Sequence, residues 1–198
     1  MKKMSTFLFT IGLLTTSLFG QCYLQPNLGL SVHSVNQHPD LKLSYNVGFS
    51  MGLLGGYEVY DNISLEAEAF YKYNSFDKVT VQDFEWDGVG FFHSYGVLAG
   101  GKWTFAPIDD VVSIYIGLSV GMERAYEEIE LSTLYVDQEA YSLPMFKDSH
   151  CCPCVQGKIG VNCPSLEGKA TSRIEYNVIK SCKDFTQHSL TYNIRWTI

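Results

Sequence analysis

Positive charge is scarce in this sequence, and no long apolar run follows its first twenty residues. Its 198 residues include 14 Lys and Arg against 21 Asp and Glu, which gives a formal net charge of −7. An acidic chain of this kind argues against nucleic acid as a partner. No later segment is apolar over the ~20 residues that a transmembrane helix needs. The composition therefore argues against a helical membrane protein and against a nucleic-acid-binding protein.

The sequence also lacks the motifs of catalytic and cofactor sites. It contains no Gly-rich phosphate loop, no HExxH and no paired metal motif. A serine hydrolase needs converging Ser, His and acidic side chains, but His93 and Ser94 are adjacent, and adjacent residues of a strand point to opposite faces. His33 falls on a polar face near a loop, as an ordinary polar side chain would, and the remaining histidines lie in loops without a recognisable partner spacing: His38, His150 and His188. We predict no enzyme, no catalytic residue, no metal and no cofactor.

The N-terminus has the features of a secretory signal. Lys2 and Lys3 precede an apolar stretch from Phe7 to about Phe19, and small or polar residues follow. The stretch is short for a membrane-spanning helix and is typical of a cleaved signal. We expect a signal peptide over residues 1–20, with cleavage between 20 and 22, and a single domain over residues 21–198.

The most informative feature is strict alternation from Leu41 to Leu53. Every second residue is apolar, and the residues between are Lys, Ser, Asn or Gly. A period of two indicates a β-strand with two different faces. The run exceeds the ~5–6 residues of an ordinary strand and suffices for the ~9–11 residues of a transmembrane strand.

Similar alternation divides the chain into eight segments. They are Tyr23–Val35, Leu41–Val59, Ile63–Asn74, Gly90–Phe105, Val111–Tyr126, Val155–Cys163, Lys169–Lys180 and a last segment that ends at Ile198. The connections after the second, fourth and sixth segments are short. Two others are long and acidic, Ser75–Val89 and Glu127–Cys154. Short turns on one rim and long loops on the other are typical of transmembrane barrels.

Glycine and charge indicate that the polar faces line a lumen. Glycines recur at four-residue steps on these faces, as at Gly48, Gly52 and Gly56, and the interior of a small barrel needs such small residues. The same faces carry nearly balanced charges, which become a paired network when they are desolvated. We predict a lumen network of Glu66, Glu68, Lys72, Lys102, Glu123, Lys158, Arg173, Glu175 and Arg195.

Aromatic residues lie near the ends of the segments. Tyr71, Tyr73, Phe91 and Tyr95 are near the long connections, whereas Tyr57, Trp103, Phe105 and Trp196 are near the short turns. Aromatic belts of this kind suit the two interfaces of a membrane. The alternative is a soluble, lipocalin-like ligand-binding barrel, which has an apolar core and a polar exterior.

The whole mature chain resembles the eight-stranded outer-membrane barrels of the OmpA/OmpX type, including the opacity-type surface proteins. Its terminal strand is similar to their assembly signal at Thr191, Trp196 and Ile198, although Asn193 replaces a glycine. The resemblance implies an all-β, antiparallel, up-and-down transmembrane barrel with both termini periplasmic. It also implies the bacterial outer membrane as the location, with its lipid, lipopolysaccharide and the barrel-assembly machinery as partners.

Six cysteines make disulfides the default expectation in an exported protein. If Lys158 lies opposite Glu175, the same register places Cys151 opposite Cys182, which makes Cys151–Cys182 the candidate disulfide. Cys152 and Cys154 compete for this pairing, and intermolecular disulfides are an alternative.

Two classes of function remain open: a structural barrel, or a surface protein whose loops bind a host or extracellular partner. A lipid A-modifying enzyme is a further alternative. A porin-like barrel shape does not imply a channel, because eight strands enclose only enough room for side chains.

Overall fold

The computed structural model describes residues 21–35, 41–81, 84–108, 112–131, 134–136, 139–141, 146–164, 170–181 and 185–198. The expected signal peptide, residues 1–20, lies outside the described residues, as does Cys182. Within the described part of the chain, no helix is long and apolar enough to cross a membrane.

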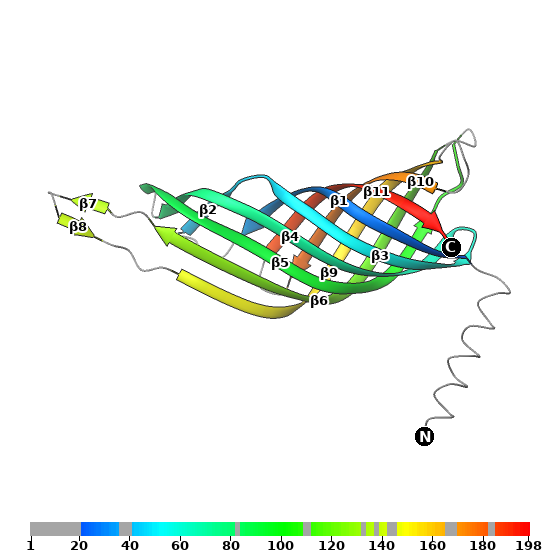
Figure 1. Ribbon diagram of the computed structural model, residues 1–198, viewed down its shortest axis with the longest axis horizontal. Helices are drawn as coiled ribbons and strands as arrows, with labels where there is room; N and C mark the ends of the chain where they lie inside the picture. Colours follow the sequence, from blue (N-terminus) through cyan, green and yellow to red (C-terminus); the bar gives the residue numbers. More distant parts are fainter. Residues whose placement is uncertain are drawn as a thin grey trace, which may run out of the picture.

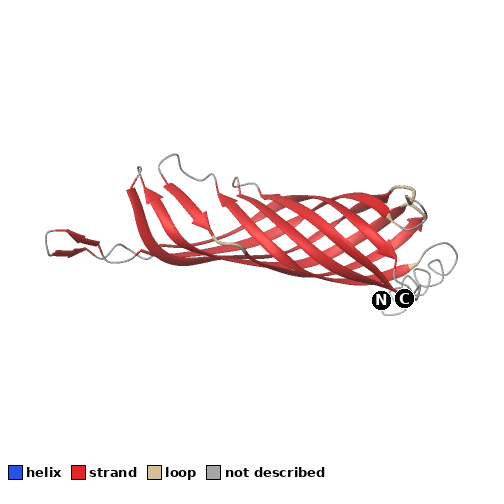
Figure 2. Ribbon diagram, turned by 90° about the horizontal axis from the view of Figure 1, so that it is seen from above, coloured by secondary structure: helices blue, strands red, loops and turns tan. Residues whose placement is uncertain are grey.

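The chain folds into a closed antiparallel β-barrel that is longer than it is wide (Figures 1 and 2). Eight barrel-spanning segments, which we call staves, form the wall of the barrel, and β2 and β3 together make the second stave. β7 (Leu134–Val136) and β8 (Glu139–Tyr141) form a separate small hairpin. The staves are β1 (Cys22–Val35), β2 (Leu41–Tyr45) with β3 (Gly48–Tyr60), β4 (Ile63–Val81), β5 (Phe84–Thr104), β6 (Ser113–Leu131), β9 (Phe146–Pro164), β10 (Ala170–Ser181) and β11 (Phe185–Thr197).

Strand register closes the barrel with a defined stagger. β1 pairs with both β3 and β11, and the Ile198 amide donates to the Cys22 carbonyl at 2.9 Å. One outward-facing ladder leaves β5 at Trp103, crosses the other staves and returns to β5 at His93. The shift from residue 103 to residue 93 is ten residues, so the strands tilt strongly against the barrel axis.

The predicted bounds of the second segment need one correction. The expected unbroken segment Leu41–Val59 is two strands, because the ladder with β4 shifts register between Ser44 and Tyr45. At this break the Asn46 amide donates to the Ser75 carbonyl at 2.8 Å, and the Asn74 side chain donates to the Asn46 carbonyl at 3.0 Å. A side chain therefore satisfies backbone that the ladder leaves unpaired.

The long connections are also shorter than predicted. β4 and β5 continue together as far as the pair Val81 and Phe84, and β6 pairs with β9 as far as Ile129 and Phe146. The predicted loops Ser75–Val89 and Glu127–Cys154 are mostly strand, since backbone pairing does not need the membrane pattern of alternating polarity. Two hairpins thus extend beyond the rest of the barrel.

The outer surface of the barrel is apolar. Leu28, Val97 and Leu118 have about three fifths of their side-chain surface exposed, while the polar residues between such positions are buried inside. This arrangement inverts the pattern of a soluble barrel, which the lipocalin-like alternative requires. From the run that begins at Leu41, Val47, Phe49, Met51 and Leu53 all face outward.

Candidate functional site

The lumen is filled with polar side chains, and the structure brings the nine predicted charged residues into it. Eight are buried, and Arg195 lies at the end near the short turns with its side chain 12% exposed. Successive inward residues of β4 are Glu66, Glu68, Phe70 and Lys72, which is the order of layers along the lumen. The residues form a turn-side network, an apolar plug and a loop-side cluster.

Glu66 is the centre of the turn-side network, which comprises Tyr23, Glu66, Glu68, Lys102, Tyr115, Lys158, Arg173 and Glu175. The Glu66 carboxylate accepts from the Tyr23 hydroxyl at 2.5 Å and from Lys102 Nζ at 3.1 Å, and it also pairs with Lys158. One buried carboxylate therefore faces two ammonium groups from different strands. A desolvated charge requires such close compensation.

Two tyrosines complete the turn-side network. The Tyr23 ring lies 4.9 Å from Lys102 Nζ and 5.6 Å from the Arg173 guanidinium, and Tyr115 lies at similar distances from both cations. The Tyr115 hydroxyl donates to Glu175 at 2.7 Å. Both tyrosines thus offer a ring face to the cations and a hydroxyl to a carboxylate. Sequence reasoning missed this role, although Tyr115 has the same parity as the inward-facing Gly117.

Glycines make room for these large side chains. A Cβ at Gly56 would overlap the Tyr23 ring, and a Cβ at Gly160 would overlap the Tyr115 ring. A Cβ at Gly117 would come within 2.6 Å of Lys158 Cε. The predicted use of glycine in the lumen is therefore specific: each of these glycines faces one bulky residue on a neighbouring strand.

An apolar plug lies beyond the turn-side network. Phe70, Leu98, Cys154 and Ile179 form a cluster in which each residue is at most 5% exposed. It separates Glu68 from Lys72 along β4, and Glu175 from Ser181 along β10. A water-filled path along the lumen would have to cross this plug.

The loop-side cluster comprises Lys72, Ser94, Glu123, Ser181 and Gln187. The Glu123 carboxylate accepts from the Ser181 hydroxyl and from the Gln187 amide, and Ser94 donates to Gln187 Oε1 at 3.2 Å. Lys72 Nζ is buried and has no hydrogen-bond partner among the described atoms. Neutral donors thus satisfy the Glu123 carboxylate, while Lys72 Nζ lies over the Phe70 ring, 5.8 Å from its centroid.

His93 and Ser94, the adjacent pair considered for a serine hydrolase, do not come together in the structure. Ser94 faces the lumen, where it bonds to Gln187, whereas His93 faces outward beside Tyr126 at a ring-centroid distance of 5.0 Å. Their predicted separation onto opposite faces is confirmed. Within the described ranges, no three His, Cys, Asp or Glu side chains are placed to hold a metal ion.

The register argument for the Cys151–Cys182 disulfide is wrong. Lys158 lies opposite Asn177, and Glu175 lies opposite Gly160, two residues away from the expected alignment. Cys151 is exposed on the outer face opposite Arg124. The pairing itself involves Cys182, outside the described residues, and stays a prediction without support from register.

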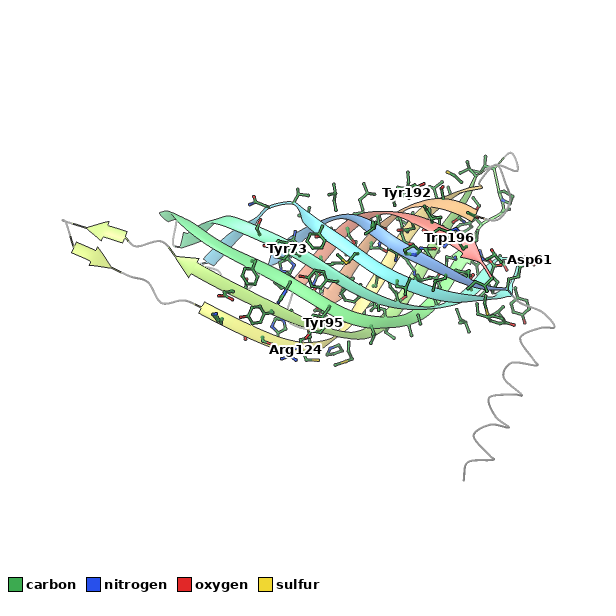
Figure 3. The ribbon with its side chains drawn as sticks, in the orientation of Figure 1. Asp61, Tyr73, Tyr95, Arg124, Tyr192 and Trp196 are labelled. Atoms are coloured by element: carbon green, nitrogen blue, oxygen red, sulfur yellow. The ribbon has the colours of Figure 1, made fainter. Side chains whose placement is uncertain are left out.

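Aromatic side chains lie on the outer face at both ends of the apolar belt. Trp103 and Trp196 are exposed near the short turns, and Figure 3 shows Trp196 near Asp61, far from Tyr73 and Tyr95. Near the long hairpins, Phe49, Tyr71, Tyr73, Phe91, His93 and Tyr126 form a continuous series of ring contacts. We call this series the loop-side aromatic row.

Solved structures with this architecture exist, although the sequence matches no protein-family model and no curated protein. The attachment invasion locus protein Ail of Yersinia pestis, in complex with the heparin analogue sucrose octasulfate, is 14% identical. The match covers 91% of this chain and 100% of Ail, with a TM-score of 0.57. Neisserial surface protein A is 15% identical, over 88% of this chain and 96% of that one, with a TM-score of 0.58. The predicted fold, a closed eight-stranded antiparallel barrel of the outer-membrane type, is confirmed.

Proposed function

We propose that this protein is an integral barrel of the bacterial outer membrane that acts as a solid scaffold for surface-exposed hairpins. The observation that carries the proposal is the inverted polarity of the barrel. A charge-balanced network fills the lumen, and an apolar belt between two aromatic ends covers the outside. In water this apolar surface would promote aggregation. In a bilayer it contacts the lipid chains, and the closed barrel pairs its backbone groups between strands.

The filled lumen supports a structural role over a channel. The turn-side network holds three buried carboxylates, Glu66, Glu68 and Glu175, and three buried cations, Lys102, Lys158 and Arg173, and Glu66 forms ion pairs with both lysines. The apolar plug lies directly beyond it. Eight strands leave no space around these side chains for a continuous aqueous pore.

The orientation follows from the extended hairpins, which lie at the opposite end of the barrel from the short turns. Both ends of the described chain lie at the rim with the short turns (Figure 2). Outer-membrane barrels have short turns in the periplasm and long connections outside. We therefore propose periplasmic termini, extracellular β4–β5 and β6–β9 hairpins, and delivery of the last strand to the barrel-assembly machinery through Thr191, Trp196 and Ile198.

Fractionation tests the location. Cells that express the full chain are separated into soluble, inner-membrane and outer-membrane fractions, and each is run on gels with and without boiling. We expect an outer-membrane band whose migration changes on boiling, because a closed barrel resists the detergent until heated. An epitope inserted between Val81 and Phe84 should be detected on intact cells, and the same epitope inserted in the short turn between Asp61 and Asn62 should not. A soluble periplasmic product would refute the proposal.

The hairpins are the proposed contact surface, since function on rigid scaffolds usually resides in such projecting segments. The Ail structure contains the heparin analogue sucrose octasulfate, which is a polyanion, whereas the first residues of β5 in this chain include the acidic Glu85 and Asp87. Like charges repel, so we propose a partner with a positively charged surface, such as a basic matrix or host-cell protein.

Hairpin shortening tests the contact surface. Deletion of residues 78–87 joins Asp77 to Gly88 and leaves three residues between the paired Phe76 and Gly90, and three-residue loops are common in hairpins. We expect this variant to assemble and to lose adhesion to cultured host cells or immobilised basic matrix proteins. A variant with the same ten residues in scrambled order is the control for length and charge. Unchanged adhesion after deletion would remove this role and leave the structural one.

A further inference from the structure

The barrel wall has a split on the hairpin side, between β1 and β2. β1 pairs with β3 only as far as the pair Ser31 and Gly48, whereas along its other edge it pairs with β11 as far as Val35. Among the described strands β2 pairs only with β4, although β1 and β2 come near each other. Residues 32–35 of β1 and residues 41–45 of β2 therefore share no backbone ladder.

The two edges of this split are bonded to different neighbours. β2 is paired along its length with residues 76–81 of β4, which lead into the β4–β5 hairpin. The last residues of β1 are paired with residues 185–188 of β11. A displacement of the hairpin relative to β11 would therefore pull the two edges apart, and no ladder between them would resist it.

One side chain spans the lower end of the split. Asn74 is 2% exposed, and its Nδ2 donates to the Ser31 carbonyl of β1 at 2.9 Å and to the Asn46 carbonyl, at the break between β2 and β3, at 3.0 Å. The Ser31 hydroxyl donates in return to Asn74 Oδ1 at 3.0 Å. These three residues, which we call the Asn74 clasp, connect the two edges at the point where the ladder ends.

A glycine makes room for the Asn74 clasp. A Cβ at Gly48 would overlap the Tyr73 carbonyl and would come within 2.7 Å of Asn74 Nδ2. A larger residue at position 48 would thus displace the amide from the two carbonyls that it holds.

The Asn74 clasp lies at the level of the loop-side aromatic row. Phe49 and Tyr73 of that row are direct cross-strand neighbours, and Tyr73 immediately precedes Asn74. Aromatic belts mark the interfaces of a membrane. In the hydrocarbon region every backbone group must be paired within the protein, whereas water can pair with such groups outside it. A split wall is therefore compatible with the region above the clasp and incompatible with the region below it.

We propose that the Asn74 clasp stops a lateral opening of the barrel wall at the bilayer surface. Above the clasp, β1 and β2 separate and rejoin as the β4–β5 hairpin moves, and below it the wall stays closed. Movement of the hairpin is thereby kept from separating the strands within the bilayer. This inference goes beyond the scaffold role, and it rests on the proposed membrane location only for the level at which the opening ends.

Amide hydrogen exchange tests the split and the clasp separately. The full chain is folded into phosphatidylcholine nanodiscs, and exchange is followed for single amides by NMR spectroscopy. In the wild type we expect fast exchange for the amides of residues 32–35 and 41–45 that point into the split, and slow exchange for residues 28–31 and 49–52. In Asn74→Ala the slow group should exchange about tenfold faster, which corresponds to ~1.4 kcal/mol, because two backbone carbonyls lose their donor. Asn74→Asp keeps the shape and the acceptor but lacks the donor, so it should show the same change.

Asn177→Ala is the matched control. Asn177 is also a buried amide of the lumen, and its Nδ2 donates to the Thr191 hydroxyl at 3.5 Å on a strand remote from the split. This variant should leave the exchange of residues 28–31 and 49–52 unchanged.

Slow exchange throughout residues 32–35 and 41–45 of the wild type would contradict the opening. Unchanged exchange of residues 28–31 and 49–52 in the Asn74 variants would contradict the clasp, and so would an equal acceleration by Asn177→Ala. If the Asn74 variants form no barrel whose gel migration changes on boiling, Asn74 holds the whole barrel, and a role confined to the split is wrong. A wild-type chain that does not enter the nanodisc contradicts the proposed function, and the same exchange measurement in detergent micelles then still decides whether the wall is split.

Discussion

The turn-side network and the loop-side cluster lie in one lumen, yet they stabilise buried charge in different ways. On the turn side, Glu66 directly contacts Lys102 and Lys158, and both tyrosines bridge cations and carboxylates. On the loop side, Glu123 is held by neutral donors, and Lys72 has no hydrogen-bond partner among the described atoms. The comparison indicates that the turn-side network fixes the barrel, while the loop-side cluster tolerates change.

The largest expected effect comes from Glu66→Gln. This change leaves Lys102 and Lys158 buried without their shared carboxylate, and breaking a buried ion pair costs ~3–5 kcal/mol. The free energy of unfolding in urea, measured on the refolded barrel in detergent micelles, should fall by about that amount. Glu58→Gln is the matched control, since Glu58 pairs with Arg195 at the partly exposed end of the lumen, and its loss should cost at most ~1 kcal/mol. Equal effects of the two substitutions would contradict the central role of Glu66.

A smaller effect is expected from Gly56→Ala, because the added methyl overlaps the Tyr23 ring at the edge of the turn-side network. Overpacking of this kind costs ~1–3 kcal/mol. Gly157→Ala is the control, because a Cβ at Gly157 meets nothing within 4 Å. Urea unfolding of the two variants under identical conditions checks the difference. If Gly157→Ala destabilises the barrel as much as Gly56→Ala does, strand propensity explains the result and the close approach to Tyr23 does not.

The substitutions Lys72→Met and Lys102→Met should change the stability of the barrel in different directions. Methionine is similar in length to lysine and removes the buried charge in both places. Only the loss of Lys102 takes an ion-pair partner away from a carboxylate, that of Glu66. We expect Lys102→Met to destabilise the barrel and Lys72→Met to be neutral or to stabilise it by up to ~1 kcal/mol. Thermal melts of both variants in the same detergent would show the contrast. Strong destabilisation by Lys72→Met would mean that the loop-side cluster is as rigidly paired as the turn-side network.

The smallest effect concerns an ion pair outside the lumen. Lys147 donates to Glu128 beyond the loop-side aromatic row, and this hydrogen bond holds the pKa of the Glu128 carboxyl below its ordinary value. A depressed pKa stabilises the fold above the unfolded-state pKa, and this contribution is lost as the pH falls through the lowered value. NMR titration of the Glu128 carboxyl carbon should show the low pKa, and Lys147→Gln should return it to the ordinary range. An identical titration in both proteins would exclude the pair.

Parity explains how much of the lumen was predictable from the sequence. The period of two assigns every residue of a strand to one face, which is why all nine predicted charges enter the lumen. A register shift of two residues preserves this parity, so the sequence could not reveal that Lys158 lies opposite Asn177. Nor could it reveal that Lys158 reaches Glu66 on a strand that is not its neighbour. Contacts across the lumen depend on the ten-residue stagger, which emerges only when all eight staves close.

The extended hairpins were missed for a related reason. Alternation of apolar and polar residues reports a boundary between lipid and lumen, and it fades where a strand enters water. Val79, Val81, Phe84 and Trp86 still pair across the β4–β5 ladder, and their β-branched and aromatic side chains favour strand without any membrane. Local β-propensity was therefore the signal that could have placed the ends of these strands.

The pairing of β1 with β11 also constrains the timing of assembly. The first strand of the domain has its partner at the opposite end of the sequence, so the sheet keeps two open edges until the last residues have been delivered. Contacts of such long sequence separation make folding slow. Until the barrel closes, each chain exposes strand edges that can pair with another copy, and we expect loss of the last strand to prevent closure.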